Sequence, residues 1–183
     1  MRLLAVAACA LMASTAMAPA LAQNGSQDST YSGSITGKDG TIGEAHLTDT
    51  PNGVLLQLVI NEGALEPGVH ALHFHETGDC SDAPDFKKSG GHYNPTDAKH
   101  GIMTEGGMHA GDMPNFQVVD GQATKLDVFN TRVRFHDGDA PLMDDDGSAL
   151  MIHAGADDYE SQPSGDAGSR VGCMVIDDEQ AQQ

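Results

Sequence analysis

Short apolar runs alternate with turn residues along this chain from residue 31 to residue 176. The clearest run is residues 53–60, in which every second position holds a large aliphatic side chain: Val54, Leu56, Leu58 and Ile60. A period of two places such side chains on one face of a β-strand. Asp-Gly at 39–40 and Asn-Gly at 52–53 supply the residues that tight hairpins prefer. The pattern therefore predicts strands joined by short turns.

Eight such runs predict eight strands, and no segment shows a helical period of useful length. The predicted strands are 31–37, 42–47, 53–60, 70–75, 116–119, 123–129, 149–153 and 171–176. Short strands with turn signals between them are typical of an all-β sandwich or barrel. Two long polar loops interrupt the pattern, one of roughly forty residues after residue 75 and one over residues 154–169. Loops this long usually serve a function.

Histidines gather around the first of these loops. His73 and His75 stand on the same side of their strand, because alternate residues of a strand share a face. The loop then carries His92, His100, His109 and Asp112, and His153 ends a later strand that could lie beside the first pair. His46 and His136 lack any such pattern and are interpreted as surface residues. His70 lies on the opposite face from His73 and is interpreted as packing, with an indirect role at the site left open.

The grouped residues have the chemistry of metal ligands. Four imidazoles suit copper, whereas imidazoles with one carboxylate suit tetrahedral zinc. The candidate ligands of this chain are six histidines and one aspartate. If two metals with four ligands each are present, one histidine must be shared between them.

The first residues have the form of an export signal. Arg2 precedes a mostly apolar run, and Ala20-Leu21-Ala22 has the small-x-small form that signal peptidase cuts, so residues 1–22 are expected to be removed. No later segment approaches the length of a membrane span, and no membrane anchor is expected. Cys80 and Cys173 then remain as an even pair in an oxidising compartment, which predicts one disulfide.

Composition limits the partners. The 183 residues carry 9 Lys and Arg against 27 Asp and Glu, a net charge of −18, and loss of Arg2 makes it −19. A chain this acidic is repelled by nucleic acid and by anionic lipid surfaces. About 160 residues after cleavage suit one domain. We expect a flexible segment at 23–30, the domain at 31–177 and a polar tail at 178–183.

An ordered set of motifs resembles the copper/zinc superoxide dismutases, in particular their bacterial periplasmic branch. The motifs are GVHALHFH at 68–75, GGHYNP at 90–95, KHG at 99–101, HAGD at 109–112, IH at 152–153 with DD at 157–158, and GSRVGC at 168–173. They follow the family's order and cover nearly the whole chain after the signal. Each motif alone is a weak signal, but the complete ordered set is highly specific.

The resemblance implies a flattened eight-stranded Greek-key β-barrel of the sandwich type, and a site that converts superoxide to dioxygen and hydrogen peroxide. It implies copper at His73, His75, His92 and His153, and zinc at His92, His100, His109 and Asp112. His92 would bridge the two metals and pick up a proton when copper is reduced. Asp157 would orient one histidine of each metal, Arg170 would receive the anion, and Cys80 would pair with Cys173. Location in the periplasm is expected, and a homodimer is left open.

The chain departs from the family in the loop at 154–169, which holds Asp157, Asp158, Glu160 and Asp166 but no Lys or Arg. Many members of the family place lysines near the funnel that leads to the site, where they attract the substrate, so the rate is expected to depend weakly or abnormally on salt. The main alternative is a module that stores or delivers copper and zinc without turnover. A second alternative is a structural domain whose histidines have no function. It is discounted, because seven ligand residues would then occur in the family's order by accident.

Overall fold

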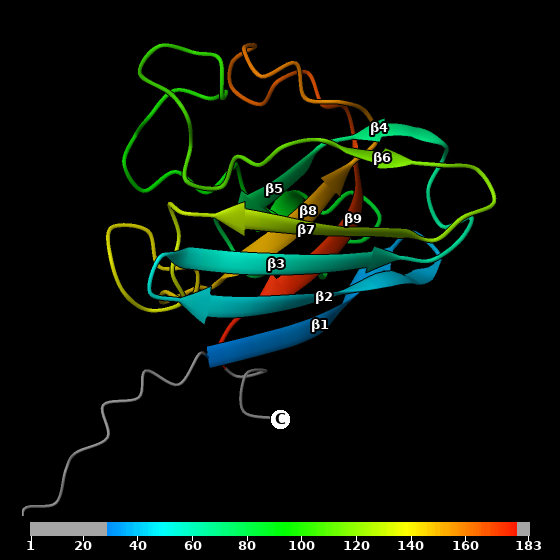
Figure 1. The fold of residues 1–183 in the computed structure, drawn as a ribbon, viewed down its shortest axis with the longest axis horizontal. Helices are drawn as coiled ribbons and strands as arrows, with labels where there is room; N and C mark the ends of the chain where they lie inside the picture. The colour runs from blue at the N-terminus through cyan, green and yellow to red at the C-terminus, as the bar shows by residue number, and fades with distance from the viewer. Residues whose placement is uncertain (1–28, 179–183) are drawn as a thin grey trace, which may run out of the picture.

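The computed structural model describes residues 29–178, and these residues form a nearly all-β fold (Figure 1). The expected signal peptide at 1–22, residues 23–28 of the expected flexible segment and residues 179–183 of the expected tail lie outside the described residues, whereas Ser29 and Thr30 belong to the first strand. The strands are β1 (Ser29–Gly37), β2 (Gly40–Thr50), β3 (Gly53–Ile60), β4 (Gly68–His70), β5 (Leu72–His75), β6 (Phe116–Val118), β7 (Thr124–Asn130), β8 (Ser148–His153) and β9 (Arg170–Ile176). One 3-10 turn, η1 (Lys87–Ser89), lies in the first long loop. The predicted all-β class is confirmed.

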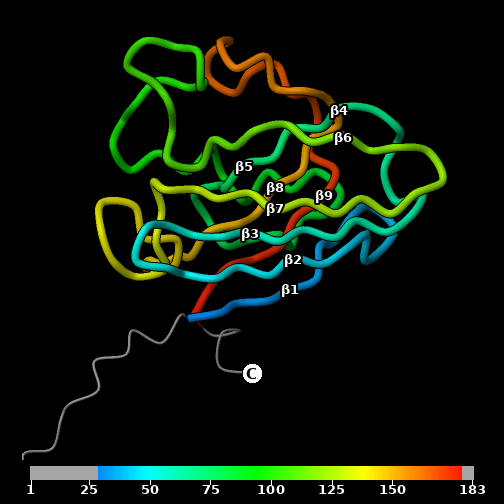
Figure 2. The backbone as a smooth tube through the Cα atoms, in the orientation of Figure 1, coloured from blue at the N-terminus to red at the C-terminus, as the bar shows by residue number. Residues whose placement is uncertain are grey.

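Seven strands form one antiparallel sheet in the order β5-β8-β9-β1-β2-β3-β7, and β4 pairs with β6 in a second, two-stranded sheet. The large sheet curls, so that β7, β3 and β2 lie in front of β5, β8 and β9 in Figure 1. The two long loops lie together at one side of the curled sheet, where the green and orange segments of Figure 2 approach each other. Residues far apart in the sequence therefore meet outside the barrel wall.

The core lies between the two halves of the curled sheet. Val54, Leu56, Leu58 and Ile60 are all at most 1% exposed, as their alternation along β3 predicts. They belong to one cluster that also includes Phe74 of β5 and other buried side chains of β1, β2, β8 and β9. Burial of apolar surface contributes about 25 cal/mol per Å². This cluster supplies the rigid wall on which the histidines of β5 and β8 are mounted.

The single strand predicted at 70–75 is wrong in one respect, since it is broken at Ala71 into β4 and β5. Ala71 donates its N–H to the Gly155 carbonyl at 2.8 Å, and its own carbonyl accepts from the His153 N–H at 3.0 Å. These long-range bonds take Ala71 out of the ladder that β4 forms with β6. The break lets β5 pair with β8 instead, and it fixes His153 beside the strand that carries His73 and His75.

The predicted disulfide is confirmed. Cys80 and Cys173 are bonded, with their Cα atoms 5.8 Å apart and a sequence separation of 93. On the chain-entropy model, closing a loop of this length contributes about 4–5 kcal/mol to stability. The bond ties the first long loop to β9, three residues beyond Arg170. Within residues 29–178, no helix is long and apolar enough to cross a membrane.

Candidate metal centre

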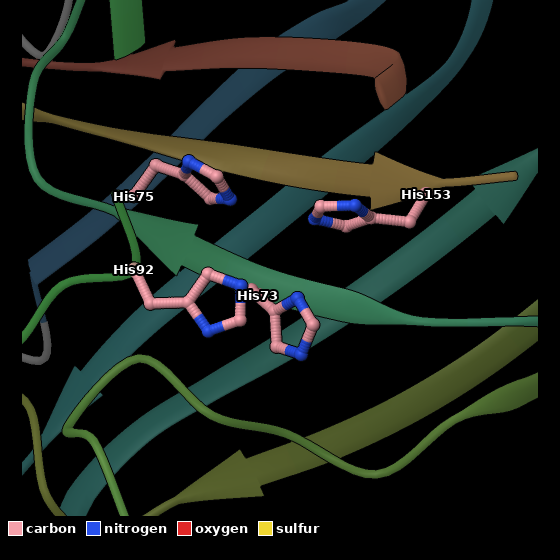
Figure 3. A group of neighbouring side chains, drawn as sticks. All are labelled: His73, His75, His92 and His153. Atoms are coloured by element: carbon pink, nitrogen blue, oxygen red, sulfur yellow. The ribbon is translucent and has the colours of Figure 1, made fainter. Parts of the chain in front are cut away.

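Four buried histidines from three parts of the fold surround one small space (Figure 3). His73 and His75 come from β5, His153 ends β8, and His92 lies in the first long loop. The antiparallel pairing of β5 with β8 brings His153 close to the first pair. One ring nitrogen from each of the four lies within 4.8 Å of the others. The structure thus brings together the four residues that the resemblance assigns to copper.

Each of these four rings has one nitrogen with a hydrogen-bond partner and one without. The unpartnered atoms are His73 Nδ1, His75 Nε2, His92 Nε2 and His153 Nε2, all of them buried. The other nitrogens contact, in the same order, Asp157 Oδ2 at 2.8 Å, the Gly90 carbonyl at 3.1 Å, Asp112 Oδ1 at 3.0 Å and the Gly168 carbonyl at 3.4 Å. A buried polar atom without a partner is costly, so four of them facing one another fit a site for a metal ion.

A second group, His92, His100, His109 and Asp112, lies beside the first. Asp112 Oδ1 is 3.0 Å from His92 Nδ1, 3.1 Å from His100 Nδ1 and 3.5 Å from His109 Nδ1. Its other oxygen accepts the backbone N–H groups of Gly101 and His109, each at 3.0 Å. Three imidazole nitrogens and one oriented carboxylate are the donor set of a tetrahedral zinc site.

His92 belongs to both groups through different atoms. Its Nδ1 faces Asp112 in the second group, while its unpartnered Nε2 faces the first group. Since the two nitrogens lie on opposite sides of the ring, one imidazole can contact two metals at once. The geometry fits the shared histidine that a count of seven ligands for two metals requires.

Asp157 contacts one histidine of each group. Its Oδ2 is 2.8 Å from His73 Nε2, and its Oδ1 is 3.1 Å from His100 Nε2. The side chain is buried and also accepts the Tyr159 N–H at 2.6 Å. A carboxylate that holds the far nitrogen of a ligand histidine fixes its tautomer and the orientation of its ring. Asp157 can therefore orient one histidine in each group.

Arg170 stands at the entrance to the four-histidine group. It lines a hollow of about 550 Å³ together with His75, His92, His109 and His153. Its Nη1 donates to the Phe86 carbonyl and to Ser89 Oγ, and its Nη2 donates to the Gly90 carbonyl. Arginine has five N–H donors, so two are not used by these contacts. A fixed cation with unused donors beside the four histidines suits a small anion.

Comparison with known proteins identifies the architecture. The family model described as copper/zinc superoxide dismutase (SODC) matches residues 41–176. The chain belongs to the copper/zinc superoxide dismutase family. Among its relatives, superoxide dismutase (Cu-Zn) 1 of Aquifex aeolicus is 42% identical over 149 residues, covering 80% of this chain and 86% of that protein. Superoxide dismutase (Cu-Zn) of Caulobacter vibrioides is 42% identical over 144 residues, covering 76% and 79%.

Solved structures agree on the fold. A superoxide dismutase-like (SOD-like) protein from Bacillus subtilis superposes with a TM-score of 0.74 at 30% identity, covering 79% of this chain and 97% of that one. The Cu/Zn superoxide dismutase from Brucella abortus gives a TM-score of 0.62 at 24% identity, covering 80% and 99%, and this likeness bears on the fold alone.

Burial lowers the pKa of His92 and His153. Burial, together with nearby His73, lowers the pKa of His153 to about 3. Burial also lowers the pKa of His92 to about 4, although its hydrogen bond to Asp112 acts in the opposite direction. Burial alone would raise the pKa of Asp112, but hydrogen bonds from His109, His92 and the Gly101 N–H outweigh it and hold that pKa well below its ordinary value. Neutral imidazoles beside an ionised carboxylate are ready to bind metal ions.

The metal-free protein is expected to lose stability in acid in a defined window. Unfolded histidine has a pKa of about 6.5, so between about pH 6.5 and 4 the unfolded chain binds protons that folded His92 and His153 do not. The free energy of unfolding should fall by at least about 3 kcal/mol across this window and stay level just above it. Urea unfolding at a series of pH values measures this. A double variant of exposed His46→Gln and His136→Gln is the control and should keep the same slope, whereas a level wild-type curve would contradict the prediction.

Two residues near the site, Asn115 and Gln162, were not predicted from the sequence. The Asn115 side chain holds the peptide groups of Asp157, donating to its carbonyl at 2.8 Å and accepting its N–H at 2.9 Å. The Gln162 side chain holds His100 in a similar way. Both are amides in polar loops, where such residues are common. His70 is buried, with Nδ1 2.7 Å from the His153 carbonyl, and His46 and His136 are exposed as expected.

Proposed function

We propose that this protein is a superoxide dismutase, with copper at His73, His75, His92 and His153 and zinc at His92, His100, His109 and Asp112. The observation that carries the proposal is the set of four unpartnered ring nitrogens facing one another beside Arg170, at a hollow open to a small anion. Membership of the family and the names of its relatives support the same reaction. Bound copper would supply the one-electron redox chemistry, and zinc, which has no redox chemistry, would shape the site.

The roles of the protein groups follow from their positions. The two N–H donors of Arg170 that its contacts with Phe86, Ser89 and Gly90 do not use hold the superoxide anion by charge-assisted hydrogen bonds. His92 lines the same hollow, and its Nε2, which has no hydrogen-bond partner within residues 29–178, can hold a proton for the peroxide product. Asp157 keeps the rings of His73 and His100 oriented, because its two oxygens accept hydrogen bonds from their Nε2 atoms. Asp112 is itself held in place by the N–H groups of Gly101 and His109, which donate to its Oδ2. Two superoxide ions and two protons yield dioxygen and hydrogen peroxide.

The decisive experiment measures metal content and superoxide dismutase activity on the same purified protein, with and without a copper chelator. Near one copper and one zinc per chain with activity that the chelator removes is the expected result. Both metals bound without turnover would favour the alternative of a metal-storing module.

Export and assembly are the finer parts of the proposal. The form of residues 1–22 supports cleavage after Ala22 and a location in the periplasm. A homodimer is supported by the exposed apolar side chains Ile102 and Phe129, which line a hollow of about 210 Å³ on one face. The mass of the amino-terminal peptide and the sedimentation of the purified protein test these two parts separately.

Lysines outside the loop at 154–169 lie near Arg170. Lys38 and Lys87 line a hollow of about 630 Å³ together with Arg170. Three of the nine Lys and Arg residues of this acidic chain thus line the same hollow. Lys87 also pairs with Asp85 at 2.9 Å. The Debye length is about 10 Å at 0.1 M salt, so interactions over longer distances are largely screened. The positive charge beside Arg170 attracts superoxide at short range, whereas the repulsion by the net charge of −18 acts at long range and is weakened by salt.

The dismutation rate is therefore expected to change by less than about threefold between roughly 0.01 and 0.15 M ionic strength. The double variant Lys38→Ala with Lys87→Ala should be slower at low salt and become faster as salt is added, because only the net repulsion is then left to screen. Pulse radiolysis measures the rate. Lys125→Ala with Arg132→Ala removes the same charge elsewhere and is the control. A steep fall in the wild-type rate with added salt would count against this prediction.

A further inference from the structure

The side chain of Gln162 joins the two long loops by clamping the backbone of His100. Its Oε1 accepts the His100 N–H at 2.9 Å, and its Nε2 donates to the His100 carbonyl at 2.8 Å. The same Nε2 lies 2.9 Å from the carbonyl of Glu160 in its own loop. One amide group thus satisfies both polar groups of a residue 62 positions away in sequence.

The loop segment that carries Gln162 is held by hydrogen bonds between residues on either side of it. The Gly165 N–H donates to the Ser161 carbonyl at 2.7 Å, and the Asp158 N–H donates to the Gly165 carbonyl at 2.9 Å. The Asp158 side chain also accepts the Ser161 N–H at 2.8 Å. Pro163 follows directly and restricts the backbone of Gln162 to extended conformations. Gln162 is exposed, and ordering its side chain costs rotamer entropy, but the backbone of the segment is already held and adds little to that cost.

The next two residues form part of the wall of the anion hollow. Pro163 and Ser164 line it together with His75, His92 and Arg170. Gln162 therefore has His100, a residue of the second metal group, on one side and the wall of the hollow on the other. A shift of the His100 backbone is therefore transmitted through the Gln162 side chain to Pro163 and Ser164, and a shift of these two residues is transmitted to His100.

We propose that Gln162 is a positioning residue that couples zinc binding at His100 to the shape of the anion hollow beside Arg170. The inference rests on the proposed function, in that His100 is taken as a zinc ligand through Nδ1. Asp157 holds the ring of His100 at Nε2, and Gln162 holds its backbone, so both are needed to keep Nδ1 aimed at Asp112 Oδ1, 3.1 Å away. Loss of the clamp frees the backbone of His100 and lets Pro163 and Ser164 move.

The test uses the metal-loaded enzyme and two variants. Gln162→Met keeps the length of the side chain and removes its hydrogen bonds, while Gln162→Glu keeps the acceptor for the His100 N–H and removes the donor. Two readouts apart from activity are the rate at which zinc passes to a colorimetric chelator and the affinity of the copper site for azide, read from its absorbance. Gln57→Met is the matched control, because Gln57 is an exposed glutamine on β3 that bonds the side chain of Asp127.

In the Gln162→Met protein we expect zinc release about three- to tenfold faster and azide affinity about threefold weaker, with Gln162→Glu between it and the wild type and Gln57→Met unchanged. A lower unfolding temperature in Gln162→Met without a change in either readout would mean a merely structural role and overturn the inference. Unchanged zinc release in both Gln162 variants would also overturn it. A wild-type protein that takes up no zinc would instead remove the proposed function, and this inference with it.

Discussion

Replacing Arg170 by alanine is expected to lower the rate of superoxide dismutation by about ten- to a hundredfold while both metals stay bound. Hydrogen bonds to a charged group contribute about 1.5–3 kcal/mol, and each 1.4 kcal/mol corresponds to a tenfold change in rate. Arg170 lines the hollow beside His75, His92 and His153. Within residues 29–178, its hydrogen-bond partners are the carbonyls of Phe86 and Gly90 and Ser89 Oγ. It is therefore not placed as a metal ligand.

Two controls separate the loss of this cation from other effects of the change. Arg132→Ala removes an exposed arginine outside the anion hollow and changes the net charge by the same amount, so it should leave the rate nearly unchanged. Arg170→Lys keeps the charge but not the geometry of the donors, and it should retain an intermediate rate. Metal analysis of each variant accompanies the rate measurement. A full rate in Arg170→Ala would show that the anion binds elsewhere and would contradict this role of Arg170.

Gly165→Ala is expected to weaken metal binding by about ten- to a hundredfold, the range found when a group that orients a metal ligand is lost. A Cβ at Gly165 would lie 1.9 Å from Asp157 Oδ1 and 2.7 Å from His100 Nε2, so the carboxylate would have to leave its position. Asp157 would then no longer hold both His73 and His100. Competition with a chelator of known affinity measures the change for each metal.

The chain offers a matched control for backbone strain. Gly121 has φ of +69°, close to the +67° of Gly165, but a Cβ there would meet nothing within 4 Å. An alanine in this left-handed region costs about 1–2 kcal/mol in either place. Gly121→Ala should therefore lower the stability modestly and leave metal affinity unchanged. Equal metal affinity in the two variants would mean that Asp157 can move aside without loss of its role.

Much of this fold could be predicted from local patterns. The alternation along residues 53–60 predicts which face of β3 is buried, because the period of a strand is a property of the backbone alone. The same period predicts that His73 and His75 share a face. The motif set that resembles the family names all seven residues of the two groups that the structure brings together. Export and an even number of cysteines predict the disulfide between Cys80 and Cys173.

Other features depend on contacts between distant residues. Ala71 breaks the predicted strand because its polar groups bond Gly155 and His153, more than eighty residues away. No local pattern carries that information. The loops at 76–115 and 154–169 lack periodicity, so the positions of Asn115, Gln162 and Gly165 against Asp157 and His100 follow only from how the loops pack on each other. The meeting of Lys38 and Lys87 with Arg170 has the same origin.

The all-β class and the buried faces of the strands could thus be read from the amino-acid sequence, because they depend on the period of the backbone, which is a local property. The seven residues of the two groups were named by the resemblance of ordered motifs to a family. The three-dimensional fold was needed to show which nitrogen of His92 faces each group, how the side chain of Gln162 joins the two loops, and which lysines lie near Arg170. Those features depend on long-range hydrogen bonds and close packing, whose partners a linear pattern does not specify.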